Sequence, residues 1–282
     1  FIKSRITRLY PIYWTSVLLT FLVVIFFGSP IYEANFKQLL ANLTMFQIAL
    51  MIENIDGSYW SLFVELKFYI FIGMFLVAKQ YFKKINLDHF VIFWLILTII
   101  NLFVKDVFLM KLAKYLFILE WSSYFIAGMV FSQIFRDRFK MKHGLLLSIC
   151  LFLTFYNLSV RIEEFDAFYL VDHSTTIIFT TVTLFFVLMF FISKGKLGFL
   201  NSPKLLQLGL LTYPLYLLHQ IIGFIIFNNL GDYFNKYILV VLTTIVMILV
   251  SYVISKKIDP ILSSALRKNL ESFYTWSKLK KK

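Results

Sequence analysis

Four ionisable residues lie inside apolar stretches of this 282-residue sequence: Glu65, Lys67, Glu120 and His219. An ionisable side chain in a bilayer costs about 3 kcal/mol or more unless it has a partner, so each is a candidate functional position. Carboxylate and imidazole groups can move protons or hold polar ligands. The chemistry to look for is therefore proton transfer or polar-ligand binding at membrane depth.

Glu65 lies in the stretch GSYWSLFVELKFYI, about one turn inside the outer end of a predicted helix. At helical spacing Ser61, Glu65 and Tyr69 share one face, and this polar stripe is expected to point into a helix bundle. Lys67 projects from nearly the opposite face and cannot pair with Glu65 along the helix. Two roles stay open for Glu65: a bond that holds helices together, or a part in a reaction or binding site.

His219 lies in LGLLTYPLYLLHQIIG, where Thr212, Tyr216 and His219 fall on one helical face. Pro214 is expected to loosen this helix by freeing the carbonyl of Leu210. A histidine near a tyrosine can serve proton transfer. Structural hydrogen bonding is an equally open role for His219.

The remaining acidic candidate and the N-terminal basic cluster each have a simpler interpretation. Glu120, in YLFILEWSSYFIAG, is expected to pair with a neighbouring helix and to be structural. Lys3, Arg5 and Arg8 precede the first apolar block and can simply set the topology of the chain. The alternative for these three residues is an anion clamp, because guanidinium groups bind phosphate oxygens in a bidentate manner.

The composition is that of a membrane protein. Hydrophobic residues make up 60% of the chain and charged residues only 15%, against about 45–50% and about 25% in soluble domains. The net charge of +13 does not indicate nucleic-acid binding, because the basic residues occur in short clusters between apolar blocks, as in cytoplasmic loops. Cys150 is the one cysteine, so no intrachain disulfide forms, and no metal site is expected.

The sequence predicts an all-α, polytopic transmembrane helical bundle. A span needs about 17–25 residues. The block at 38–52 contains Gln38, Asn42 and Gln47 and is the weakest candidate for a span. The apolar blocks are 11–28, 38–52, 60–78, 89–104, 115–135, 144–157, 174–193, 206–227 and 237–254.

Loop charges favour about eight spans, with 38–52 as a re-entrant or interfacial helix. Basic and acidic loops then alternate, and both ends of the chain lie in the cytoplasm. The predicted domains are a membrane domain at 1–254 and a basic cytoplasmic tail at 255–282, which contains Trp276 and lies on anionic lipid. The basic loop clusters are Lys3–Arg8, Lys79–Lys84, Arg136–Lys142 and Lys194–Lys204.

Three stretches together resemble the acyltransferase-3 family of membrane acyltransferases. KSRITRLYPIYW is similar to its basic stretch before an Arg-x-x-Pro-like turn. GSYWSLFVELKFY resembles the Trp-Ser-Leu-x-Val-Glu-x-x-Phe-Tyr motif, the most specific of the three, with Leu66-Lys67 where a second acidic residue and Gln are frequent. LLTYPLYLLHQ resembles the late Ser-Tyr-x-x-Tyr-Leu-x-His motif, with Thr212 in place of Ser.

The resemblance implies an enzyme of a bacterial-type inner membrane, with no permanently bound cofactor. It would transfer an acyl group, acetyl being the expected one, from cytoplasmic acyl-CoA to a hydroxyl of a glycan or lipid-linked sugar. By resemblance Arg5 and Arg8, with Lys3, would hold the phosphates of the donor. Glu65 and the face carrying Tyr216 and His219 would shape the buried site.

One departure from the family concerns its principal catalytic histidine, which follows a basic residue by eleven positions on the first transmembrane helix. The positions eleven before the four histidines His89, His143, His173 and His219 are Ala78, Ser132, Ile162 and Leu208, and none is basic. We therefore expect two further helices before Phe1 that carry this histidine, and the fragment to be incomplete as an enzyme.

Two other classes of function compete with this reading. In a transporter or exporter of a glycan or small anion, Glu65 and His219 would serve coupling or substrate binding, although no internal repeat supports it. A polysaccharide polymerase or ligase would favour a large outer loop, and the longest here, at about 158–173, is short.

Overall fold

The computed structural model describes residues 1–28, 30–82, 84–104 and 106–279. Lys83 of the second basic cluster and Lys280–Lys282 of the tail lie outside them, as do the side chains of residues 168–169 and 273–279, Trp276 included. The described residues form helices and connecting turns without a strand, as the sequence predicts. They divide into two compact units: unit 1 comprises Phe1–Tyr69 and Ser202–Lys282, and unit 2 comprises Ile70–Asn201.

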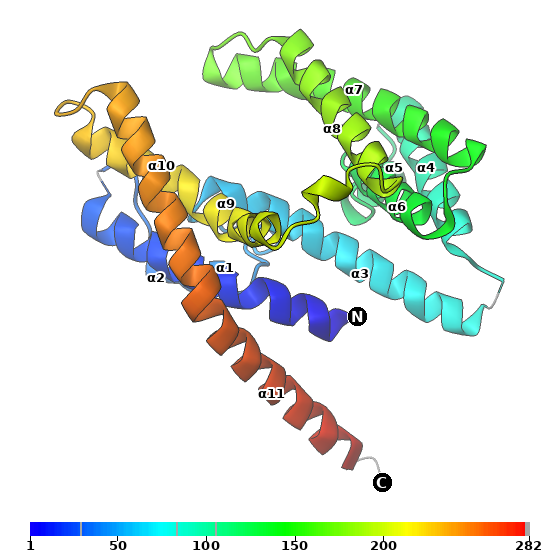
Figure 1. The fold of residues 1–282 in the computed structure, drawn as a ribbon, viewed down its shortest axis with the longest axis horizontal. Coiled ribbons are helices and arrows are strands. Elements are labelled where there is room, and N and C mark those ends of the chain that lie inside the picture. The colour runs from blue at the N-terminus through cyan, green and yellow to red at the C-terminus, as the bar shows by residue number, and fades with distance from the viewer. Residues whose placement is uncertain (29, 83, 105, 280–282) are drawn as a thin grey trace. The chain divides into compact units, whose positions relative to one another are not determined.

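Unit 1 is built around helix α9 (Pro203–Leu230), which packs against α1 (Ile2–Phe27) and α10 (Lys236–Val253) (Figure 1). A short 3₁₀ turn, η1 (Gly57–Tyr59), leads into α3 (Trp60–Tyr81) and also contacts α9. The core between these helices is apolar and aromatic. Its fully buried members include Tyr13, Val17, Tyr59, Leu217 and Leu218.

The segment between α1 and η1 folds back onto α1. Its helix α2 (Phe36–Leu43) has eight residues and is about 12 Å long, far less than the about 30 Å of a bilayer core. Asn42 is fully buried, and its side chain donates to the carbonyls of Gln38 (2.9 Å) and Glu53 (3.0 Å). Tyr13 of α1 donates to the Asn42 carbonyl at 2.6 Å. The region 38–52 contains no helix long enough to cross a bilayer, which agrees with the prediction that it is not a span.

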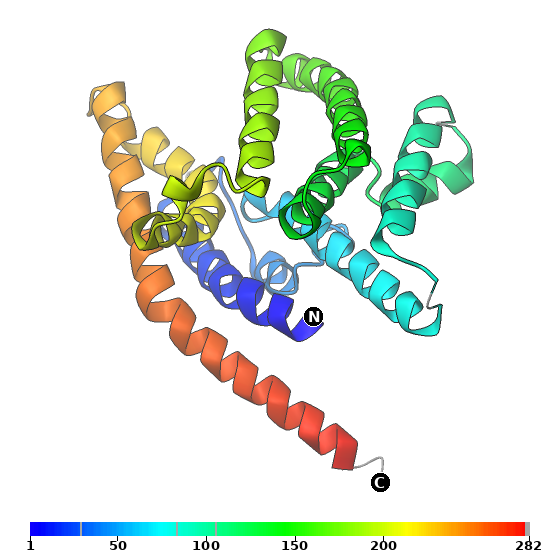
Figure 2. The same ribbon diagram turned by 45° about the vertical axis from the view of Figure 1, so that its right-hand side comes forward.

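The C-terminal segment is a long helix with a bend. A π-helical turn, η3 (Ile254–Ile258), connects α10 to α11 (Asp259–Leu279), and Figure 2 shows the two helices as one bent rod. Pro260 explains the turn, because a proline cannot bond to the carbonyl four residues before it and clashes with it. The segment expected as a tail from residue 255 is therefore helical as far as it is described.

Two serines of this segment bond to carbonyls that prolines have freed in other helices. Pro11 leaves the carbonyl of Thr7 without its helical partner, and the Ser263 hydroxyl, whose hydrogen is shared with Oδ1 of Asp259 at 2.7 Å, lies 3.0 Å from that oxygen. Pro214 likewise leaves the carbonyl of Leu210 without its helical partner, as predicted. The Ser255 hydroxyl donates to the Leu210 carbonyl at 3.3 Å. The C-terminal segment thus supplies a partner for the carbonyl freed in α1 and for the one freed in α9.

Unit 2 contains the end of α3 and five further helices: α4 (Leu87–Phe103), α5 (Phe108–Leu116), α6 (Ser122–Asp137), α7 (Met141–Tyr169) and α8 (Thr175–Ser193). Helix α6 packs against α4, α7 and α8. Phe71, Phe90, Trp94 and Phe117 form an aromatic cluster, with the ring centroids of Phe71 and Trp94 5.0 Å apart. A second 3₁₀ turn, η2 (Gly198–Leu200), precedes α9.

The helices confirm a multi-span membrane protein, but not the count of eight. Six of the described helices are long and apolar enough to cross a bilayer. The two other predicted spans correspond to α4 with 17 residues and α6 with 16, which are about 24–26 Å long and short for a bilayer core. The block 115–135 is not one helix, because a turn at 117–121 separates α5 from α6.

Candidate functional site

The start of α3 is fixed by Asp56, the residue that caps the 3₁₀ turn leading into this helix. Its carboxylate is fully buried and accepts from the amide (2.8 Å) and the hydroxyl (2.6 Å) of Ser58. Its second oxygen accepts from the backbone N–H of Ile221 in α9 at 2.9 Å. A Cβ on Gly57 would lie 2.8 Å from Nε2 of Gln220, the end of a flexible side chain that would have to shift. The Asp-Gly-Ser sequence is a helix-capping signal that could have revealed Asp56.

Burial raises the pKa of Asp56, because desolvation disfavours the charged carboxylate. The hydrogen bonds from Ser58 and Ile221 act in the opposite direction, as does the imidazole of His219 when it is protonated. Asp56 is thus a buried carboxylate within electrostatic reach of His219.

Tyr216 ties α9 to the first turn of α3. Its hydroxyl lies 2.7 Å from the hydroxyl of Ser61 and donates to the carbonyl of Ser58 at 3.0 Å. The sequence placed Ser61 on the Glu65 face and Tyr216 on the His219 face, and the structure brings these two residues into contact. Residues from two motifs 155 positions apart therefore meet in one hydrogen-bonded cluster.

Glu65 and Tyr69 form a hydrogen bond one turn further along α3, with the tyrosine hydroxyl as donor. The guanidinium of Arg5 in α1 lies 5.1 Å from the centre of the Tyr69 ring, in cation–π contact. The Nε of Arg5 is buried and has no hydrogen-bond acceptor among the described residues. The polar stripe of α3 thus faces the N-terminal basic cluster.

Tyr213 of α9 completes this arrangement. Its hydroxyl donates to the carbonyl of Leu9 in α1 at 3.2 Å. It also lies within electrostatic range of Glu65, Tyr69 and Arg8. Three helices of unit 1, α1, α3 and α9, therefore contribute polar groups to one cluster, and Tyr213 was not among the residues selected from sequence.

His219 lies on α9 one turn from Tyr216 and has an exposed side chain. Its Nδ1 is 2.9 Å from the carbonyl oxygen of Tyr216. Because a carbonyl can only accept, Nδ1 carries the hydrogen, and Nε2 is the basic atom of the neutral ring. This arrangement leaves Nε2 suited to accepting a proton.

The three basic residues of the N-terminal cluster have different surroundings. Arg5 is half-buried against Tyr69, and Arg8 is exposed. Lys3 forms an ion pair with Glu271 of α11, which also lies 3.6 Å from Arg267. A phosphate group would have to compete with Glu271 for Lys3, whereas Arg5 and Arg8 have no ion pair among the described residues.

Glu120 pairs with a neighbouring helix, as its sequence position led us to expect. Its carboxylate lies 2.9 Å from Arg161 of α7 and 2.7 Å from Lys114 of α5. All three residues belong to unit 2, whereas the polar cluster of α1, α3 and α9 belongs to unit 1.

These features define a class of protein, the polytopic helical membrane proteins with a cluster of ionisable side chains among their helices. Comparison with protein families makes the class specific: the acyltransferase domain family matches residues 1–256. This chain belongs to the acyltransferase-3 family and is an acyltransferase. Neither the search of curated proteins nor that of solved structures found a match.

Proposed function

We propose that this protein transfers an acyl group, with acetyl the expected one, from cytoplasmic acyl-CoA to a hydroxyl of a glycan or lipid-linked sugar. The observation that carries the proposal is the convergence of Glu65–Tyr69, Tyr213 and Arg5 from three helices of unit 1. The family match supports acyl transfer, and the polar cluster supplies charged and hydroxyl groups for substrates that hydrocarbon excludes. We propose a bacterial-type inner membrane as the location, with both ends of the chain cytoplasmic.

Arg5 and Arg8 are proposed to hold the phosphates of the donor. A guanidinium binds phosphate oxygens bidentately and stays charged at all relevant pH values. The buried Nε of Arg5 lacks an acceptor among the described residues, so a phosphate oxygen would satisfy it. Lys3 is the least available of the three, because it already pairs with Glu271.

In the proposed reaction the acceptor oxygen attacks the thioester carbonyl, its proton passes to a base, and the coenzyme A thiolate leaves and is protonated. Glu65 and Tyr216 would orient the acceptor hydroxyl by hydrogen bonds. Nε2 of His219 is the proposed base within this chain, since Nδ1 is engaged by the Tyr216 carbonyl. Asp56 would stabilise the protonated imidazole, because the two groups interact electrostatically.

The test uses membranes that contain the full-length protein, radiolabelled acetyl-CoA and a glycan acceptor fraction. We expect label in the glycan, and a loss of about 100-fold or more for His219→Ala if its Nε2 is the base. Full transfer by His219→Ala would exclude that role while leaving acyl transfer intact. Uptake or export of intact substrate without covalent labelling would instead support a transporter.

A further inference from the structure

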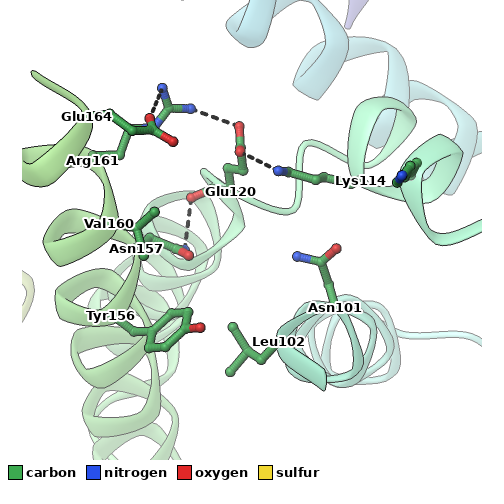
Figure 3. Close-up of a pocket in the computed structure, with 10 residues that line it drawn as sticks. Asn101, Leu102, Lys114, Glu120, Tyr156, Asn157, Val160, Arg161 and Glu164 are labelled. Atoms are coloured by element: carbon green, nitrogen blue, oxygen red, sulfur yellow. Dashed lines mark hydrogen bonds and ion pairs between the residues drawn. The ribbon is translucent and has the colours of Figure 1, made fainter. Parts of the chain in front are cut away.

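A cavity of about 450 Å³ lies within unit 2, between the ends of α4 and α5 and the second half of α7. This volume is in the range of small-molecule sites, about 300–1,000 Å³. Figure 3 shows Asn101 projecting from α4 into the space that faces Glu120, with Tyr156 on the opposite wall. The polar side chains that line the cavity include those of Asn101, Lys114, Glu120, Tyr156, Asn157 and Arg161.

Glu120 is the centre of the polar wall. Its carboxylate bridges Lys114 at 2.7 Å and Arg161 at 2.9 Å, and its backbone carbonyl accepts from the Asn157 side chain at 3.1 Å (Figure 3). The Arg161 guanidinium also lies 5.0 Å from the centre of the Trp121 ring. These contacts fix the charged groups in one arrangement, and preorganised polar groups are what a binding site requires.

The backbone before Glu120 is strained. Ile118, which is 3% exposed, has a φ of 46°, a left-handed conformation that a β-branched residue rarely adopts. Such strain costs about 1–3 kcal/mol, and it is concentrated at sites where a side chain must be held in place. Here it turns the chain so that Glu120 faces the cavity.

The wall carries three cations, Lys111, Lys114 and Arg161, and two carboxylates, Glu120 and Glu164. Lys114 and Arg161 share Glu120, Arg161 also lies 3.9 Å from Glu164, and Lys111 lies 3.6 Å from Asp106. Each cation of the described wall therefore has a carboxylate partner, so the cavity offers no unpaired positive charge to an anion. It offers donors and acceptors side by side, which suits hydroxyl groups because each hydroxyl both donates and accepts.

We propose that this cavity, bounded by Asn101, Glu120, Tyr156 and Arg161, binds an uncharged carbohydrate. The side-chain amide of Asn101 and the Glu120–Arg161 pair would bond to sugar hydroxyls, and the Tyr156 ring would cover an apolar sugar face. The loop charges predict that this end of unit 2 faces away from the cytoplasm, where glycans of the envelope are found. The inference stands independently of acyl transfer, because binding is measured without an acyl donor.

The experiment measures saturation-transfer NMR and tryptophan fluorescence on the full-length protein in nanodiscs. The probes are neutral trisaccharides of glucose, galactose or N-acetylglucosamine, with inorganic phosphate as the competing anion. We expect saturable binding of at least one trisaccharide, weakened at least about tenfold by Asn101→Leu and by Glu120→Gln. Glu163→Gln is the matched control, since Glu163 is an exposed carboxylate of α7, the helix that supplies Arg161, and it does not line the cavity.

The Glu120→Gln variant loses two ion pairs, and this loss can unfold it. In that case the Asn101→Leu variant alone tests the proposal, because no hydrogen bond of the Asn101 side chain contributes to the described polar network. Equal trisaccharide binding by wild type and Asn101→Leu would overturn the proposal. So would displacement of the sugar by phosphate, which would mark an anion site, or the absence of binding by every trisaccharide.

Discussion

Glu65 is a half-buried carboxylate in the polar cluster of unit 1. It accepts from Tyr69 on its own helix, and it acts electrostatically on Tyr213 of another helix. A carboxylate so placed can orient a substrate hydroxyl or balance Arg5. Its amide isostere keeps the shape and can still accept from Tyr69, but it carries no charge.

Glu65→Gln is therefore expected to lower kcat for acyl transfer by at least about tenfold while changing the thermal midpoint little. The measurement is incorporation of label from acetyl-CoA by membranes with equal amounts of each variant. Glu53→Gln, the same change at an exposed carboxylate of the preceding loop, should keep wild-type activity. Unchanged transfer by Glu65→Gln would reduce Glu65 to a structural role.

Asp56 adds a second residue-scale prediction, on pH. Burial raises its folded-state pKa above the ordinary 3.8, so the folded protein binds this proton more tightly than the unfolded chain does. Its contribution to the free energy of unfolding is therefore greatest at low pH, and it falls as pH rises from about 3.8 through the raised pKa.

The test compares thermal midpoints of wild type and Asp56→Asn in detergent between about pH 4 and pH 7. The thermal midpoint of wild type minus that of Asp56→Asn should decrease as pH rises, because only wild type carries the buried titrating carboxyl group. A difference that stays constant or grows with pH would contradict the raised pKa. Glu33→Gln, at an exposed carboxylate, controls for general charge effects.

At the scale of the elements, α1 and α9 each contain a proline that the C-terminal segment compensates. Ser263 bonds to the carbonyl freed by Pro11, and Ser255 to the one freed by Pro214. Each hydrogen bond contributes about 1 kcal/mol net. This pairing gives η3 and α11 a structural role in unit 1.

The double variant Ser255→Ala/Ser263→Ala is expected to lose about 2 kcal/mol of stability, because two main-chain acceptors lose their partners. Its thermal midpoint should fall by several degrees. Ser264→Ala is the matched control, since the Ser264 hydroxyl bonds only within its own helix, to the carbonyl of Ile261. A double variant as stable as this control would show that the two contacts contribute nothing.

At the scale of the whole molecule, the loop charges make a prediction about sidedness. If α1 crosses and the segment with α2 does not, Glu33 and Glu53 lie on the same outer side, and Lys196 lies on the cytoplasmic side. Glu33→Cys and Glu53→Cys should react with an impermeant maleimide in intact cells, and Lys196→Cys only after permeabilisation. The buried Cys150 gives a low background. Opposite sidedness of Glu33→Cys and Glu53→Cys would show that 38–52 crosses the membrane.

The sequence by itself determined the helical class, the weakness of 38–52 as a span and the polar face of α3. The first two features follow from composition and from the length and polarity of each apolar block, and the third from helical periodicity, which brings Glu65 and Tyr69 together. The three motifs were also sufficient to indicate the family that the comparison then showed.

Only the tertiary structure decided which helices exchange polar contacts. The bond from Asp56 to Ile221 joins residues 165 positions apart, and the ion pair of Lys3 with Glu271 joins residues 268 apart. Most surfaces of these helices are similarly apolar, so hydrophobic patterning does not specify which faces meet. The partners of Asp56, Tyr213 and Glu120 follow from close packing of particular side chains, a property of the assembled helices that no local stretch contains.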